Sequence, residues 1–465
     1  MASRMGCVTG LDLASHCRLL LHSRPKHTLL WRWLGLYPLY ILSEVAIIAT
    51  DLAELLGSAI ALCLLFPKLE LWHGVLITAF DVILLLALGD PLRGTPVRMF
   101  ELLIGAMVLA VFVCMCIIIA HVDIQWGTVF QGYLPSKYII PNGALYVSVG
   151  IIGATVMPHS LFLGSALATQ DRVSTAHRSA FRKTEKLNAT GAESEDEKVQ
   201  AFDQPSVSMS LVERLRSWPS RLWTWTTDAF KVPPASSYAT TARSHSEREN
   251  NSYAFVIAHI YHGVVDMAIS LLGFAVLINS FILILASAIF YYGNGLTGDN
   301  AGKNPAGLFD AYDLIKDLVG QGAATIFAIA LLASGQSSSI IATVAGQAVS
   351  EGFLQWRVSP VVRRLLTRLL AVIPSMVVAI AMGRRGIDTL LVASQVVLSI
   401  VLPFVTFPLI YITSSKKLMS VKVPASGEES GETTKDFSNS WFSTILAWAI
   451  WLLVAIANVY VLATL

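Results

Sequence analysis

Long apolar stretches that carry few charges dominate the hydrophobic pattern of this chain. Nine of them occur, at residues 36–66, 72–89, 99–120, 144–167, 254–291, 321–350, 365–382, 388–413 and 441–464. A helix needs about 20 apolar residues to cross the hydrocarbon core of a bilayer, and a segment exposed to lipid must satisfy its backbone hydrogen bonds internally. The pattern therefore predicts an all-α polytopic membrane protein with about nine transmembrane helices.

The polar segments between these stretches define the predicted organisation. Residues 168–253 are rich in Ser, Thr, Glu, Lys and Arg and poor in aliphatic side chains, so we expect a disordered loop there. The amphipathic spacing of residues 308–319 predicts an interfacial helix. The chain is therefore predicted to consist of six segments: a cytoplasmic N-terminal segment (1–35), a first set of transmembrane helices (36–167), the disordered cytoplasmic loop (168–253), a second set of transmembrane helices (254–413), a cytoplasmic linker (414–440) and a last transmembrane helix (441–465).

Composition and charge agree with a membrane protein and predict its orientation. The 465 residues are 54% hydrophobic and only 14% charged, with a mean hydropathy of +0.62, whereas soluble domains are about a quarter charged. Cytoplasmic loops of membrane proteins carry an excess of Lys and Arg. With the N-terminus in the cytoplasm, only a few of the 33 Lys and Arg residues lie in outer loops: Lys68, Lys137, Lys303, Lys316, Arg384 and Arg385. We therefore predict a cytoplasmic N-terminus. Residues 1–28 mix Arg, Asp and His and lack a long apolar core, so we expect no cleavable signal peptide. No nucleic-acid partner is expected.

A helix break is predicted within the stretch 144–167, in the sequence from Gly153 through Met157-Pro158-His159 to Ser160. Proline donates no backbone hydrogen bond and crowds the preceding turn, and glycine adds conformational freedom. Carbonyl groups freed at membrane depth are tolerated where they are buried in protein or line a polar cavity. These residues alone leave two interpretations open, a proline kink beside a satisfied core histidine and an ion site at the break.

Three carboxylates lie on one face of the predicted helix 36–66. Glu44, Asp51 and Glu54 are seven and three residues apart, so two turns bring Asp51 back to the face of Glu44 and one more turn adds Glu54. Charged groups within a membrane face the interior of a helix bundle or an aqueous path. This stripe favours a proton or cation pathway, with a structural polar network as the alternative.

Other polar groups at membrane depth have both a structural and a functional interpretation. The small and polar residues that begin at Gly335-Gln336 allow close helix packing, and they could also line a polar cavity. Gln395 brings an amide to membrane depth, where a helix–helix hydrogen bond is the common role.

An ion site at the break would combine soft and hard ligands. Thioether sulfur favours transition metals over Ca²⁺ or Mg²⁺, whereas carbonyl and amide oxygens are harder. The Met157 sulfur, the Ala154 carbonyl and the Gln395 amide would therefore suit Mn²⁺ or Fe²⁺. This set contains no anionic ligand, so the predicted site is incomplete.

Five stretches that occur in this order resemble the NRAMP family of proton-coupled divalent metal transporters, and its fungal members in particular: Val8–Ala14, Glu44–Glu54, Gly153–His159, Gly335–Phe353 and Ser394–Ser399. The resemblance covers nearly the whole chain apart from residues 168–253. It implies a LeuT-like inverted repeat of five plus five helices, whose discontinuous first and sixth helices meet at the midplane. Carried over by position, the resemblance implies three metal ligands: Met157, Ala154 and Gln395. It implies a proton pathway formed by Glu44, Asp51, Glu54 and His159.

The sequence departs from the family pattern at several positions. The Asp-Pro-Gly-Asn motif, which supplies metal ligands on the family's first helix, does not occur, and Asp90-Pro91-Leu92-Arg93 lies in a basic inner loop instead. Ser160 replaces the usual asparagine, Gly164 a common histidine and Val401 a common glutamine. The chain begins at what resembles the end of the family's second helix, so we expect an N-terminally truncated product that lacks the first helix and most of the second.

These features favour a secondary transporter that moves Mn²⁺ or Fe²⁺ into the cytoplasm with protons. Its expected partners are divalent metal ions, protons and the lipid bilayer of the plasma membrane or of an endosomal or vacuolar membrane. The alternative is a truncated membrane protein that does not transport, such as a metal sensor or an assembly partner. An amino-acid or nucleobase transporter would gain little from a soft sulfur ligand. No nucleophile–base pair in the sequence points to an enzyme, and no bound cofactor is expected.

Overall fold

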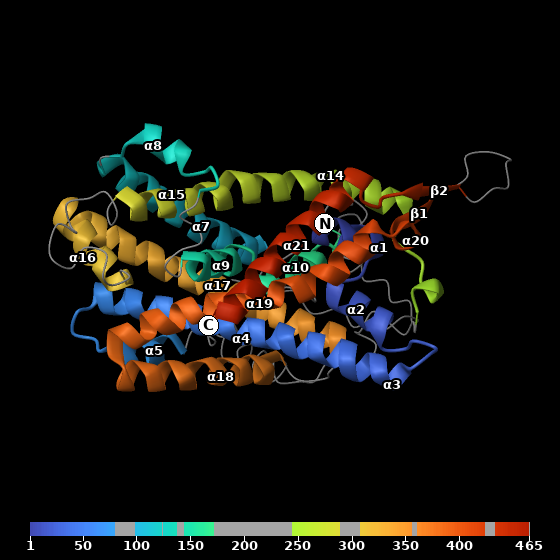
Figure 1. The fold of residues 1–465 in the computed structure, drawn as a ribbon, viewed down its shortest axis with the longest axis horizontal. Coiled ribbons are helices and arrows are strands. Elements are labelled where there is room, and N and C mark those ends of the chain that lie inside the picture. The colour runs from blue at the N-terminus through green and yellow to red at the C-terminus, as the bar shows by residue number, and fades with distance from the viewer. Residues whose placement is uncertain are drawn as a thin grey trace, which may run out of the picture.

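The protein is an elongated assembly of helices in which segments from both halves of the chain lie side by side (Figure 1). Within the described ranges a single antiparallel hairpin supplies the strands, with Ser420 opposite Asp436. The structure is a computed structural model that describes residues 1–79, 98–122, 124–136, 144–171, 244–288, 307–355, 360–423 and 433–464.

The helices before the long loop differ greatly in length. From Thr28 to Leu65 the chain is one continuous helix, so the first membrane-crossing helix begins inside the segment predicted as a cytoplasmic N-terminus. The described elements are α1 (Ala2–Thr9), α2 (Leu13–Leu21), α3 (Thr28–Trp31), η1 (Arg32–Leu36), α4 (Tyr37–Leu65), α5 (Leu71–Ala79), α7 (Arg98–His121), α8 (Trp126–Gln131), α9 (Ala144–Thr155) and α10 (Pro158–Leu167).

The later helices include α17, of 34 residues, and α19, of 32 residues. The amphipathic helix predicted over 308–319 is found as α16. The described elements are η4 (His245–Glu247), α14 (Tyr253–Ala268), η5 (Ile269–Ala275), α15 (Val276–Ala286), α16 (Leu308–Leu318), α17 (Gln321–Leu354), α18 (Pro360–Ala381), α19 (Gly383–Ser414), α20 (Lys416–Met419), β1 (Ser420–Val423), β2 (Thr433–Asp436) and α21 (Trp441–Thr464).

Most of the predicted transmembrane stretches correspond to helices of sufficient length. A shorter apolar helix covers Leu365–Ala381, and the predicted stretch 72–89 continues beyond Ala79 outside the described residues. The 7 described helices that are long and apolar enough to cross a membrane are Thr28–Leu65, Ile104–His121, Ala144–Leu167, Tyr253–Ala286, Gln321–Leu354, Gly386–Ser414 and Trp441–Thr464. The predicted all-α, multi-pass class is therefore confirmed.

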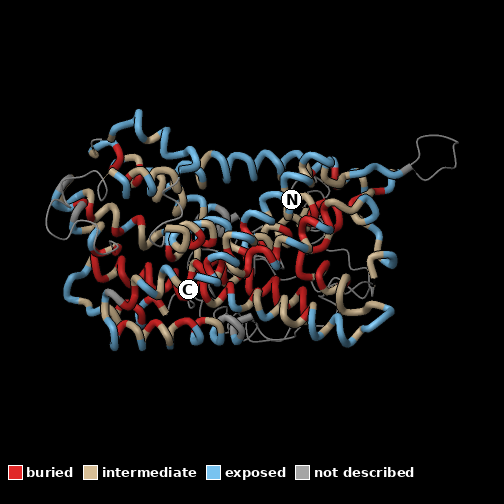
Figure 2. Tube along the Cα trace, in the orientation of Figure 1, coloured by how far each residue is buried: buried red, intermediate tan, exposed pale blue. Residues whose placement is uncertain are grey.

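The centre of the bundle is the contact between α4 and α17. A Cβ atom on Gly335 of α17 would lie 3.0 Å from the Glu54 carbonyl oxygen and 3.2 Å from the Ser58 nitrogen of α4. Small residues let two helices approach this closely within a membrane. Burial follows these central helices, whereas α14 and α15 along one edge are largely exposed (Figure 2). The small residues that begin at Gly335 thus serve close packing.

The last helix, α21, is held to α19 at a proline. Pro403 has no N–H group, so the Ser399 carbonyl four residues earlier loses its partner within the helix. Asn458 of α21 donates its Nδ2 group to that carbonyl at 2.9 Å, and the Trp451 Nε1 group donates to the Pro403 carbonyl at 2.8 Å. Asn458 is 4% exposed. The polar side chains of α21 therefore satisfy backbone groups of α19 at membrane depth.

Residues 244–252 lie against the turn between α1 and α2. The Asn251 backbone N–H donates to the Val8 carbonyl at 3.0 Å, and the Arg248 Nη2 group donates to the Gly10 carbonyl at 3.0 Å. Gly10 has a φ of 65°, which favours glycine, and a Cβ atom there would lie 2.6 Å from Asn251 Oδ1. These residues belong to the loop predicted over 168–253, yet they are tied to the helical body by backbone hydrogen bonds.

Two histidines stack beside this turn. His16 Nδ1 lies 2.8 Å from His245 Nε2, and His16 Nε2 lies 2.8 Å from Thr9 Oγ1. The two imidazole rings are nearly parallel, with centroids 5.0 Å apart. Burial, followed by the nearby His245 and Arg248, lowers the pKa of His16 to about 3. His16 is therefore neutral in the folded protein at neutral pH.

Candidate metal and proton site

The predicted helix break is found between α9 and α10. Helix α9 ends at Thr155 and α10 begins at Pro158, so Met157 stands between them in extended geometry, with φ −72° and ψ 126°. Ser160 donates both its backbone N–H, at 3.1 Å, and its hydroxyl, at 2.6 Å, to the Met157 carbonyl. Proline as the first residue of α10 fits because the first N–H groups of a helix have no partner within it. The break thus follows from local sequence.

Gly153 sets the break against α19. A Cβ atom on Gly153 would lie 2.7 Å from the Ser399 nitrogen and would overlap the Gln395 carbonyl oxygen. One turn earlier, a Cβ atom on Gly150 would lie 4.0 Å from the Gln395 Cβ atom. The structure therefore places the end of α9 and the turn that carries Gln395 side by side.

The candidate metal ligands at this contact differ in burial. Met157 and Gln395 are half-buried, and Ala154 is exposed. The Gln395 Oε1 atom is buried and has no hydrogen-bond partner within the described part of the chain. A buried amide oxygen without a partner is costly, and a bound cation would remove that cost. The thioether, the amide oxygen and the backbone carbonyl together are neutral ligands of mixed softness.

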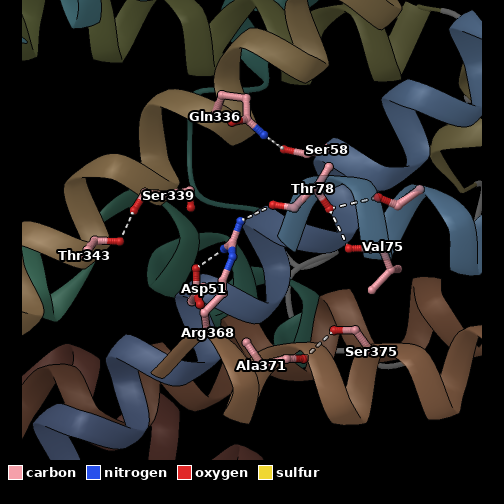
Figure 3. A network of polar contacts seen from close by, with 11 residues as sticks. Asp51, Ser58, Val75, Thr78, Gln336, Ser339, Thr343, Arg368, Ala371 and Ser375 are labelled. Carbon is pink, nitrogen blue, oxygen red and sulfur yellow. Dashed lines mark hydrogen bonds and ion pairs between the residues drawn. The ribbon is translucent and has the colours of Figure 1, made fainter. Parts of the chain in front are cut away.

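All three predicted carboxylates come from α4, and two of them are deeply buried. Asp51 is 5% and Glu54 7% exposed, whereas Glu44 is half-buried nearer the start of the helix. Asp51 forms an ion pair with Arg368 of α18 (Figure 3). Arg368 is 4% exposed, and its Nη2 group also donates to the Thr78 carbonyl at 2.9 Å. A charged network therefore crosses the bundle from α18 to α4 and α5.

His159 joins the same helix through a hydroxyl group. The Thr50 Oγ1 atom lies 3.2 Å from His159 Nδ1 and 2.9 Å from the Ala46 carbonyl oxygen. His159 is 2% exposed. Thr50 precedes Asp51, so the imidazole of α10 meets α4 next to the ion pair. The predicted proton-pathway residues Asp51 and His159 thus approach the same part of α4.

Arg368 and Thr50 are functional candidates that sequence reasoning missed. Arg368 was not singled out in the sequence, but its side chain is buried against Asp51. One sequence signal could have found it, because Arg368 lies inside the apolar stretch 365–382, and a buried carboxylate requires a cation. Thr50 carries no such signal, since threonine is common in packed helices.

The polar residues of α17 make contacts of their own. The Gln336 Nε2 group donates to Ser58 Oγ at 3.4 Å, and the Gln347 Nε2 group donates to Glu351 Oε1 at 3.2 Å. Figure 3 shows Gln336 and Ser58 above the Asp51–Arg368 pair. No group of three or more His, Cys, Asp or Glu side chains in the described ranges is arranged to hold a metal ion. The candidate ligand atoms at the break remain those predicted from the sequence, on Met157, Ala154 and Gln395.

A broken helix that packs against a second helix, beside buried charges in a bundle of membrane-crossing helices, is the architecture of a secondary transporter. The chain matches the family model "Natural resistance-associated macrophage protein-like" over residues 1–191 and 235–464. The chain therefore belongs to the NRAMP family of divalent metal transporters, which confirms the family resemblance and excludes an enzyme family.

Named relatives and a solved structure agree with this assignment. The chain is 37% identical to the manganese transporter pdt1 of Schizosaccharomyces pombe, over 98% of this chain and 74% of that protein. It is also 37% identical to the iron transporter SMF3 of Saccharomyces cerevisiae, over 98% of this chain and 84% of that protein. A crystal structure of the Eremococcus coleocola manganese transporter, in complex with an aromatic bis-isothiourea substituted compound, matches with a TM-score of 0.65 at 26% identity, over 98% of this chain and 75% of that chain.

Proposed function

We propose that this protein moves Mn²⁺ or Fe²⁺ across its membrane toward the cytoplasm, coupled to the movement of protons. The observation that carries the proposal is the break at Met157, which Gly153 sets directly against the backbone of α19 at Gln395. The two fungal relatives, a manganese transporter and an iron transporter, support the choice of metals.

The metal-binding step follows from the ligand chemistry at the break. The Met157 sulfur is a soft donor, which favours Mn²⁺ or Fe²⁺ over Ca²⁺. The Ala154 carbonyl and the Gln395 Oε1 atom add two oxygen ligands. Burying Gln395 Oε1 without a hydrogen-bond partner costs free energy, and a bound metal ion would offset that cost. The sulfur ligand selects transition-metal ions by its softness. All three ligands are neutral, so they do not compensate the charge of the bound ion. The Asp-Pro-Gly-Asn motif of the family does not occur in this sequence.

The proton-transfer step belongs to the buried charges of α4. Glu44, Asp51 and Glu54 supply carboxylates along one helix, and His159 reaches that helix through Thr50. His159 lies two residues after Met157, so metal and proton candidates share the first turn of α10. Arg368 pairs with the Asp51 carboxylate. If metal binding changes the distance between these two side chains, it would couple metal movement to proton movement.

Uptake of manganese into proteoliposomes under an inward proton gradient tests this proposal. Met157→Ala is expected to lower manganese uptake at least tenfold and to reduce the preference for Mn²⁺ over Ca²⁺, because the soft ligand is lost. Met267→Ala is the matched control, since Met267 is 38% exposed on α14, far along the chain from the break. Equal uptake and equal selectivity in both variants would remove Met157 from the site.

Proton movement is measured in the same vesicles with an internal pH dye. Asp51→Asn and His159→Gln are expected to uncouple acidification from manganese uptake, and an unchanged proton-to-metal ratio in both variants would contradict the assigned pathway. Metal binding by the purified protein without uptake under any gradient would favour the alternative of a sensor or assembly partner.

A further inference from the structure

A cluster of basic side chains lies at the start of the first membrane-crossing helix. Arg18 and His22 come from α2 and its C-terminal end, Arg24 from the following turn and Arg32 from the beginning of the long helix Thr28–Leu65. In Figure 1 these segments lie at the end of the molecule that also carries α20 and the hairpin. The cluster therefore lies at a membrane–water boundary, on the side predicted to be cytoplasmic.

Each arginine of the cluster is fixed to backbone by one of its N–H groups. Arg32 Nε donates to the His22 carbonyl at 2.7 Å, Arg24 Nε to the Leu20 carbonyl at 2.9 Å, and Arg18 Nη1 to the Phe353 carbonyl at 2.7 Å. A guanidinium group has five N–H donors, so several donors of each arginine remain for another ligand. The geometry of the three guanidinium groups is thus held in place before any ligand binds.

Arg32 and Arg18 both lie near His22, with Arg32 Nη2 3.4 Å from His22 Nδ1, and Arg24 follows His22 by two residues. No described carboxylate forms an ion pair with Arg18, Arg24 or Arg32. Burial, followed by Arg18 and Arg32, lowers the pKa of His22 to about 4, and burial followed by Arg32 lowers the pKa of Arg18. An anion bound between these groups would relieve their repulsion.

The surroundings of the cluster are apolar and exposed. Leu29 is 70%, Trp33 68% and Leu34 73% exposed, directly after the basic residues. Trp31 lies under the Arg24 guanidinium, with its ring centroid 4.3 Å from the guanidinium carbon. Tryptophan is favoured at membrane interfaces, and exposed leucines at this depth contact acyl chains. A ligand of the cluster therefore meets both charge and hydrocarbon.

We propose that Arg18, Arg24 and Arg32 bind the phosphate headgroup of an anionic phospholipid from the adjacent leaflet. The fork of an arginine matches a phosphate group in charge and geometry. The exposed leucines beside the cluster favour a lipid over free phosphate, since free phosphate would gain nothing from them. Basic pockets beside transmembrane helices on the cytoplasmic side are suited to anionic lipids, which are enriched in that leaflet.

The test measures how much phosphatidylserine the purified full-length protein retains in native mass spectrometry, after reconstitution with mixtures of phosphatidylcholine and phosphatidylserine. The variant Arg24→Gln with Arg32→Gln is expected to bind phosphatidylserine about 25-fold more weakly, from about fivefold for each lost charge near the membrane. Arg384→Gln is the matched control, because its guanidinium lies 4.2 Å from the Phe309 ring near α16, at the opposite end of the molecule.

A single variant and a competition with inorganic phosphate complete the test. Arg24→Gln alone, which loses only the contacts to the Leu20 carbonyl and the Trp31 ring, is expected to show the fivefold loss even if the double variant does not fold. Inorganic phosphate added at matched concentration is expected not to displace the lipid. Equal retention by the unchanged protein and Arg24→Gln, or full displacement by inorganic phosphate, overturns the lipid site.

Discussion

Replacing Arg368 by leucine removes the cation that faces Asp51 inside the bundle. The two side chains are 5% and 7% exposed, so neither charge can turn to water when its partner is removed. Removing one partner of a buried ion pair costs about 3–5 kcal/mol, since an uncompensated charge remains. We therefore expect Arg368→Leu to lower the free energy of unfolding by about this amount.

The double variant Asp51→Asn with Arg368→Leu separates stability from transport. It contains no buried charge at this position, so most of the lost free energy of unfolding should return. Proton-coupled uptake should be absent from the double variant, because it lacks the carboxylate that we propose carries the proton.

The assay is urea unfolding of the purified protein in one detergent, followed by helical circular dichroism, together with manganese uptake and vesicle acidification. Arg384→Leu is the control, because Arg384 is exposed and loses only its contact with the Phe309 ring, which should change the free energy of unfolding by less than about 1 kcal/mol. A loss below about 1 kcal/mol for Arg368→Leu, or a double variant no more stable than the single one, would refute the reasoning.

Three other substitutions test the packing and the electrostatics of the fold. Gly153→Ala should abolish metal uptake, because the new Cβ atom would overlap the Gln395 carbonyl, whereas Gly164→Ala, with no atom within 4 Å of its Cβ position, should transport normally. Asn458→Leu should lower the free energy of unfolding by about 1–3 kcal/mol, because the Ser399 carbonyl loses its donor. Urea unfolding should show a smaller loss when Asn458→Leu is combined with Pro403→Ala, which restores a backbone N–H. Acidification from pH 6.5 toward about 3 should weaken the fold by up to about 1.4 kcal/mol per pH unit through His16, because the unfolded chain binds a proton that the folded chain excludes. Thermal unfolding of His16→Asn across this range should lack that contribution, and an identical pH profile for the substituted and unchanged proteins would contradict it.

Local sequence predicted the features whose cause is local. The break at Met157 follows from the missing N–H of Pro158, and the face shared by Asp51 and Glu54 follows from the period of the helix. Both need no knowledge of what packs nearby, and the membrane-crossing stretches are recognised for the same reason. The fold class could therefore be predicted from apolar lengths alone.

Contacts between distant segments could not be predicted in this way. Nothing near Arg368 in the sequence shows that it meets Asp51, which lies more than 300 positions earlier. The Thr50 hydroxyl beside His159 and the Asn458 amide on the Ser399 carbonyl are similar cases. In each, a common polar residue gains its role only from the neighbour that the fold supplies.

The described segments on either side of residues 172–243 are both held to other helices. Asp171, just after α10, is hydrogen-bonded to His259 of α14, whose Nε2 atom lies 2.8 Å from Asp171 Oδ1. Asn250 donates its Nδ2 group to the carbonyls of Leu418 and Ser420, at 2.9 and 2.7 Å. The described segments that flank residues 172–243 are therefore anchored to other helices by contacts of their own. Two co-expressed fragments divided between residues 171 and 244 should therefore reassemble, because the contacts of Asp171 with His259 and of Asn251 with Val8 join them across the division.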